Sequence, residues 1–196
     1  MKFRKMLAIA IAMAAIGCGA ISVNLAAATV PDTAPIITYK ATGVFADSPT
    51  SGEDQLKLAG EPFGVSIAVS AATPPSKSGP NYDVYKGLDL LATVHSLLVG
   101  TTGVHLSSKQ AVIIQTIVPT KYDSFVMEAP VRVPVVGVNL TIKATILMPL
   151  GTISKPLLHP FKTIYLRPSN AKVSYTDGTN TTVLAIKTGK LTATIP

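Results

Sequence analysis

The sequence predicts an all-β chain that folds as a single antiparallel β-sandwich, and three observations lead to that prediction. Apolar side chains recur at every second position over much of the chain, as in Phe63–Val69 and Leu140–Met148. Val, Ile and Thr, which fit a pleated surface, are frequent in these runs. Turn-forming residues separate the runs at intervals of roughly 8–12 residues, a spacing typical of an immunoglobulin-like or jelly-roll-like sandwich.

Composition places the chain among globular proteins and excludes several other classes. Of its 196 residues, 47% are hydrophobic and 14% are charged, which is too apolar for intrinsic disorder. Cys18 is the sole cysteine, so a disulfide scaffold and a multi-cysteine zinc site are both excluded. Nothing in the sequence indicates a cofactor.

The first 28 residues have the pattern of an export signal. Lys2, Arg4 and Lys5 precede an apolar run, and Ala26–Ala28 supplies the small side chains that a signal peptidase accepts. We therefore expect cleavage after Ala28 and a secreted, periplasmic or cell-surface protein. A retained membrane helix is the alternative, but polar and glycine residues interrupt the second half of the run.

A second cleavage site is conceivable at Cys18. Ala15–Cys18 is similar to a lipobox, in which a small residue precedes a thiol that is lipidated and becomes the new N-terminus. In that alternative the protein is a lipoprotein, and the lipid on Cys18 is its link to the membrane.

The remaining chain divides into a short leader and one β domain. Residues 29–35 contain two prolines and read as extended leader, because proline is incompatible with a helix interior. Residues 36–196 carry the alternating pattern and form the predicted sandwich. The strands expected from this pattern are 36–45, 63–70, 88–95, 111–118, 122–129, 131–138, 140–148, 161–166, 171–175, 182–187 and 191–195.

One hairpin gives an internal test of this assignment. A tight turn at Asp177–Gly178 places Val173 and Tyr175 on the same face as Thr182, Leu184 and Ile186. The two apolar sets then coincide, which supports the assignment. Lys172 and Lys187 fall on the opposite face.

A candidate ligand-binding segment follows Gly79–Pro80. Tyr82, Asp83 and Tyr85 could stack on a sugar ring and hydrogen-bond to it if they form an exposed loop. The competing interpretation is that they anchor this loop to the edge of the sandwich.

The last third of the chain is basic. Residues 151–196 hold six basic side chains against Asp177 alone, a net charge of +5. This surface could bind an anionic envelope polymer, or the lysines could instead protect exposed strands from unwanted pairing. Another protein could also bind by adding a strand to an exposed sheet edge. No nucleic-acid partner is expected. The basic residues are Lys155, Lys162, Arg167, Lys172, Lys187 and Lys190.

No catalytic or metal-binding signature is present. Ser169–Lys172 has S-x-x-K spacing, but its lysine lies in the predicted strand 171–175, whereas the chemistry needs a helix. The three histidines lack the spacing of a metal site. The sequence therefore favours an exported, non-enzymatic binding or structural module at the cell envelope or outside the cell.

Two further functions remain open. The first is a secreted hydrolase-like enzyme that assembles carboxylates from distant strands. The second is a small outer-membrane barrel, since the length suits eight strands, although aromatic girdles are missing. The available acids are Glu53, Asp54, Glu61, Asp83, Asp89, Asp123 and Glu128.

Overall fold

The computed structural model describes residues 34–96, 100–133, 137–153 and 158–195. The predicted signal peptide, most of the predicted leader, Cys18 and Lys155 lie outside these ranges. Within them, no helix has the length and apolar character needed to cross a membrane.

The described chain is all-β, which confirms the predicted class. Its strands are β1 (Ile36–Phe45), β2 (Pro62–Ser70), β3 (Lys77–Gly79), β4 (Tyr82–Ser96), β5 (Gly100–Val118), β6 (Tyr122–Val133), β7 (Val138–Met148), β8 (Phe161–Leu166), β9 (Ala171–Thr176) and β10 (Thr181–Thr194).

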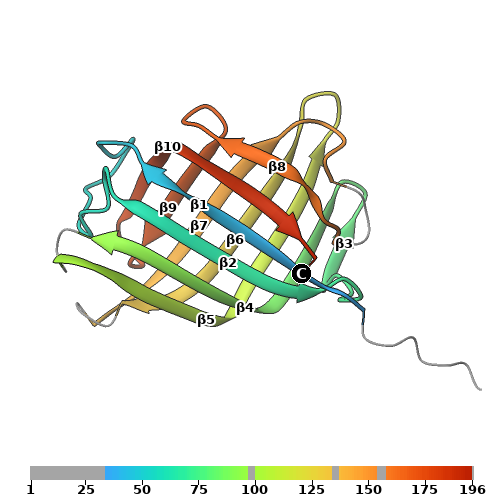
Figure 1. Cartoon of the computed structure of the whole chain (residues 1–196), viewed down its shortest axis with the longest axis horizontal. Helices are drawn as coiled ribbons and strands as arrows, with labels where there is room; N and C mark the ends of the chain where they lie inside the picture. The colour runs from blue at the N-terminus through green and yellow to red at the C-terminus, as the bar shows by residue number, and fades with distance from the viewer. Residues whose placement is uncertain (1–33, 97–99, 134–136, 154–157, 196) are drawn as a thin grey trace, which may run out of the picture. The chain divides into compact units, whose positions relative to one another are not determined.

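The strands form a closed antiparallel barrel of eight positions rather than the two stacked sheets of the expected sandwich. Neighbours follow the order β1-β2-β4-β5-β6-β7-β9-β10, and β10 pairs back to β1. In Figure 1, β10, β1, β2 and β4 cross in front of β6, β7 and β9. An alternating pattern requires one buried face per strand, and a barrel satisfies this requirement as well as a sandwich does.

The pairing of β10 with β1 closes the barrel, and β10 is longer than the sequence predicts. Residues 182–187 and 191–195 were expected as separate strands, but β10 runs through both of them. It pairs with β1 along one side, and with β9 and then β8 along the other. Similarly, β6 continues through Pro130. The segment Gly100–Gly103 has the composition of a turn, but it lies within β5.

The seam between β1 and β10 depends on two facing glycines. Gly43 pairs with Gly189 in the ladder. A Cβ at Gly189 would lie 2.4 Å from the carbonyl oxygen of Thr42, and one at Gly43 would lie 2.5 Å from that of Thr188. Since real Cβ atoms do not approach backbone this closely, only glycine allows these strands to approach as they do.

The predicted hairpin register is confirmed. Thr182 pairs with Tyr175 and Leu184 pairs with Val173, and all four side chains are buried. Lys172 lies on the exposed face.

Ring closure also changes the prospects for strand addition. Each of the eight strands in the barrel wall pairs with a neighbour on both sides, so the open edges that strand addition needs are absent from the wall. In the described part of the chain, an incoming strand would have to use the short β3 or β8.

Candidate functional site: the barrel lumen and its lid

The barrel contains an apolar cavity of about 50 Å³ at one end of its lumen. The two hydroxyl-bearing residues in its lining are Ser96 and Tyr175. The lining residues are inward-facing positions of the strands together with two leucines from the β1–β2 connection: Ala41, Phe45, Leu56, Leu58, Phe63, Val65, Leu90, Ala92, Val94, Ser96, Val104, Leu106, Met127, Val133, Ile142, Ala144, Ile146, Val173, Tyr175 and Ile186.

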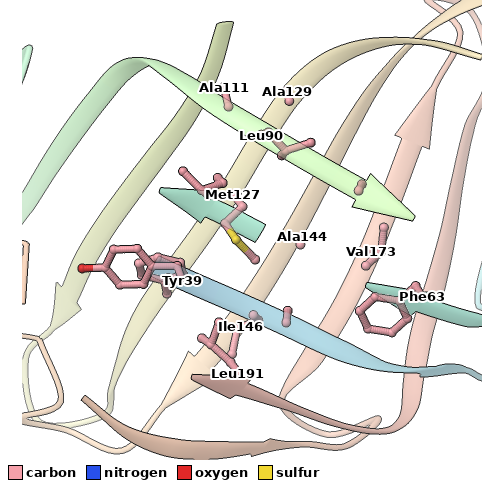
Figure 2. Packing of buried hydrophobic residues seen from close by; sticks show 14 of the residues in the cluster. Tyr39, Phe63, Leu90, Ala111, Met127, Ala129, Ala144, Ile146, Val173 and Leu191 are labelled. Atoms are coloured by element: carbon pink, nitrogen blue, oxygen red, sulfur yellow. The ribbon is translucent and has the colours of Figure 1, made fainter. Parts of the chain in front are cut away.

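Small inward side chains create this cavity. Ala41 and Ala92 lie in one row of the wall, on either side of Val65. Ala144 is inward on the opposite wall, where it pairs with Met127 and Val173. Figure 2 shows Met127, Ala144 and Val173 among the side chains that gather inside the barrel.

Aromatic side chains fill the lumen beyond the cavity. The ring of Tyr39 stacks on that of Phe125 at 5.0 Å between centroids, and Phe161 lies 5.8 Å from Tyr39. Tyr85 is also fully buried. Large rings therefore fill this part of the lumen. Phe45 and Phe63, which stack at 4.7 Å between centroids, line the cavity beside the alanines that leave it partly empty.

Residues 53–59, which we call the lid, cover the cavity. Leu56 and Leu58 of the lid contribute to the cavity lining. The Ser96 hydroxyl donates to the Leu56 carbonyl, and the Thr182 hydroxyl donates to the Glu53 carbonyl. Side chains of the barrel wall therefore hold the lid by its backbone.

A buried carboxylate and a tyrosine hydroxyl form the centre of this attachment, which we call the latch. The Tyr175 hydroxyl donates to Asp54 Oδ1 at 2.9 Å and accepts from the Leu56 amide at 3.3 Å. Asp54 Oδ2 accepts from the Ala59 amide at 2.8 Å. Asp54 is only 8% exposed, so these bonds replace its contacts with water.

The tyrosine of the latch is held in its neutral form. Burial is the largest cause of a raised pKa at Tyr175, and the nearby Asp54 carboxylate raises this pKa further, while hydrogen bonds from Thr182 and Leu56 oppose the rise. The phenol therefore keeps its proton, and the latch persists, at neutral pH.

An open groove of about 170 Å³ lies beside the lid. Leu56 and Tyr175 line both this groove and the cavity, so these two side chains form the partition between them. The groove is lined by Gln55, Leu56, Val138, Leu140, Tyr175, Asp177, Asn180 and Thr182.

The charge of the groove is negative. The exposed Asp177 carboxylate accepts from the amides of Asn180 at 2.7 Å and Thr179 at 2.8 Å. These bonds lower its pKa, so the carboxylate is ionised at neutral pH. In the described chain, neither the groove nor the cavity is lined by Lys, Arg or His.

Polar side chains are buried at the opposite end of the barrel. Asp83, Gln115 and Asp123 are at most 1% exposed. Asp123 Oδ2 accepts from the Ile153 amide at 2.8 Å, and Asp83 Oδ1 accepts from the Ser78 hydroxyl. The side-chain amide of Gln115 has no hydrogen-bond partner within the described residues.

The candidate sugar-binding residues do not share one face. Asp83 and Tyr85 are buried inside the barrel, on β4. Tyr82 has the opposite orientation and is half-buried, with the Lys77 ammonium 5.8 Å from its ring centroid. The segment is therefore part of the wall and not a surface loop.

The basic side chains lie on the outer wall. Lys162, Arg167, Lys172, Lys187 and Lys190 are all exposed. Lys187 forms an ion pair with Asp47 at 2.8 Å. Lys190 is adjacent to Tyr165 in the β8–β10 ladder, and Tyr165 is 69% exposed.

The candidate acids are dispersed. Asp83 and Asp123 face the interior from β4 and β6, with β5 between them. Asp54 belongs to the latch, and Glu128 lies 3.6 Å from Lys143 in an outward ion pair. Among the described residues, no group of three His, Cys, Asp or Glu side chains could hold a metal ion.

Sequence reasoning missed the lumen and the lid. The sequence signal for a cavity was the set of alanines at inward-facing strand positions. Such alanines leave space inside a barrel but not in a close-packed sandwich. Comparisons with protein-family models, curated proteins and solved structures found no match for this chain.

Proposed function

We propose that this chain is an exported binding protein that holds a small apolar ligand in the cavity beneath the lid. The observation that carries the proposal is a cavity inside the barrel that is lined almost entirely by apolar side chains and bordered by a hydrogen-bonded segment. Barrels with eight strands are just wide enough to hold one small ligand. An apolar cavity excludes water and favours apolar guests.

The size of the cavity limits the ligand. Its volume of about 50 Å³ is a third of the roughly 150 Å³ that accommodates benzene in an engineered cavity. A guest larger than a few carbon atoms must therefore displace Leu56 and Leu58. The best fit is a slender alkyl chain that enters as the lid moves.

The composition of the outer surface favours a binding protein surrounded by water over an outer-membrane barrel. Outward positions of β7 and β9 carry mainly Thr, Lys and Ser. Apolar outward side chains are fewer, as in the row Val84, Ile114 and Val126. A membrane-spanning barrel needs the reverse arrangement, with an apolar outer band.

Isothermal titration calorimetry with linear alcohols of increasing length tests the proposal. Each methylene that enters the cavity gains about 0.8 kcal/mol, so affinity should rise about four-fold per carbon until the space is filled. An affinity that does not depend on chain length, or the absence of binding by every alcohol, would contradict the proposal.

A matched pair of variants locates the binding site. Ala144→Leu fills the cavity from β7, whereas Thr145→Leu adds the same side chain to the outward face of the next position. We expect Ala144→Leu to abolish alcohol binding and Thr145→Leu to leave it unchanged. Thermal unfolding of both variants separates a blocked cavity from a misfolded chain.

A second candidate function concerns the basic outer wall. Lys190 and Lys40 are diagonal neighbours on β10 and β1, and the exposed ring of Tyr165 adjoins Lys190. This combination would suit an anionic envelope polymer. Co-sedimentation with such a polymer should weaken steeply with salt and fall in Lys190→Gln. Salt-independent retention would count against this candidate.

A further inference from the structure

We infer that the ligand is a single-chain amphiphile whose head lies in the groove beside the lid while its chain enters the cavity. The inference rests on the proposed function and adds the chemistry of the head: it donates hydrogen bonds and carries no negative charge. Alcohols and amines have such heads, and carboxylates do not.

The two spaces are neighbours separated by side chains alone. Leu56 and Tyr175 each line both the cavity and the groove. The cavity has an apolar lining, whereas the groove has Gln55, Asn180 and Asp177 in its wall. A molecule with an apolar end and a polar end therefore matches the two spaces in the order in which they occur.

Of the two partition residues, Leu56 is the one placed to move. Tyr175 belongs to β9, which is paired on both sides in the wall. Leu56 belongs to the lid and is half-buried, and the Tyr175 and Ser96 hydroxyls bind its backbone. Because Leu56 lies outside the strands, a movement of its side chain breaks no strand pairing.

The polar groups of the groove determine which head fits. The Asp177 carboxylate is its charged group, and the neutral Gln55 and Asn180 amides each add an acceptor oxygen and an NH₂ donor. Glu53 and Asp54 add further negative charge in the lid. The exposed Lys57 is in the lid as well, but it lines neither space. An anionic head would therefore be repelled, whereas a hydroxyl or ammonium would find acceptors.

Three ligands with the same chain test this inference. Their binding to the full mature chain is compared by isothermal titration calorimetry at neutral pH, with decanol, decylamine and decanoate as the three ligands. We expect decanol and decylamine to bind about ten-fold or more tightly than decanoate. Decanoate binding as tightly as decylamine would overturn the inference while leaving the proposed function intact. Failure of all three ligands to bind would overturn both.

A variant assigns the discrimination to the groove. Asp177→Asn removes the charge but keeps an oxygen that can accept from Thr179 and Asn180, so the turn is preserved. The preference for decylamine over decanoate should fall several-fold. Asp89→Asn, an exposed outward position on β4, is the matched control and should leave the preference unchanged. An unchanged preference in Asp177→Asn would overturn the placement of the head.

Discussion

The latch makes a specific prediction about Tyr175→Phe. The substitution keeps the ring that lines the cavity and removes only the hydroxyl that donates to Asp54 and accepts from the Leu56 amide. A hydrogen bond to a charged group contributes about 1.5–3 kcal/mol, and the longer bond from Leu56 contributes less. The free energy of lid opening should therefore fall by about 2 kcal/mol.

Native-state hydrogen exchange measures this change directly. The amide of Ala59 donates to Asp54 Oδ2, so it exchanges only when the lid opens. A loss of about 2 kcal/mol corresponds to exchange about 30-fold faster at Ala59. Tyr165→Phe, on the exposed outer wall, is the control and should not change this rate.

Two results would refute the reasoning. An unchanged rate at Ala59 would mean that the Tyr175 hydroxyl does not hold the lid. Equal acceleration at Ala59 and at the β6–β7 ladder, where Met127 pairs with Ala144, would mean that the whole barrel had been destabilised.

Three further predictions concern the barrel and its export. Gly189→Ala forces a Cβ against the Thr42 carbonyl, and the free energy of unfolding measured by chemical denaturation should fall by about 1–3 kcal/mol. In the control Gly64→Ala the new Cβ meets a methyl group at 3.9 Å, and the loss should be no more than about 0.5 kcal/mol. Equal losses would contradict the account of the seam. Burial, and to a lesser extent the Asp83 carboxylate, raises the pKa of Tyr85 to about 12. The folding stability that depends on the neutral Tyr85 side chain is therefore present below pH about 10 and is lost as the pH rises through about 12. Tyrosinate absorbance and the denaturation midpoint should therefore change together in this window, and ionisation of all tyrosines near pH 10 would contradict it. Intact-mass analysis of the exported protein should give a chain beginning at Thr29, and a lipid-modified mass beginning at Cys18 would establish the alternative.

Much of the strand pattern could be predicted from the sequence because it depends on local alternation. The hairpin around Asp177–Gly178 shows why: a short turn fixes the register, and the apolar faces of Tyr175 and Leu184 must then coincide. Closure could not be predicted in this way. Gly43 and Gly189 are far apart in the chain, and their pairing at the seam has no local signal.

The candidate site was harder to predict for the same reason. Asp54 and Tyr175 are separated by 121 positions, and neither belongs to a motif. Asp83 and Tyr85 follow turn residues, so they resembled an exposed loop, yet β4 begins at Tyr82 and alternation turns both inward. Whether an inward alanine leaves a void depends on the curvature of the wall, which a single strand does not encode.

Methyl nuclear Overhauser measurements on the protein with bound decanol test the central claim most directly. We predict contacts between the protons of the alkyl chain and the methyl groups of Leu58, Ile146 and Val173, which line the cavity. Contacts with the outward methyl groups of Leu91 or Val183, without contacts to the inward set, would contradict the claim that the barrel holds its ligand inside.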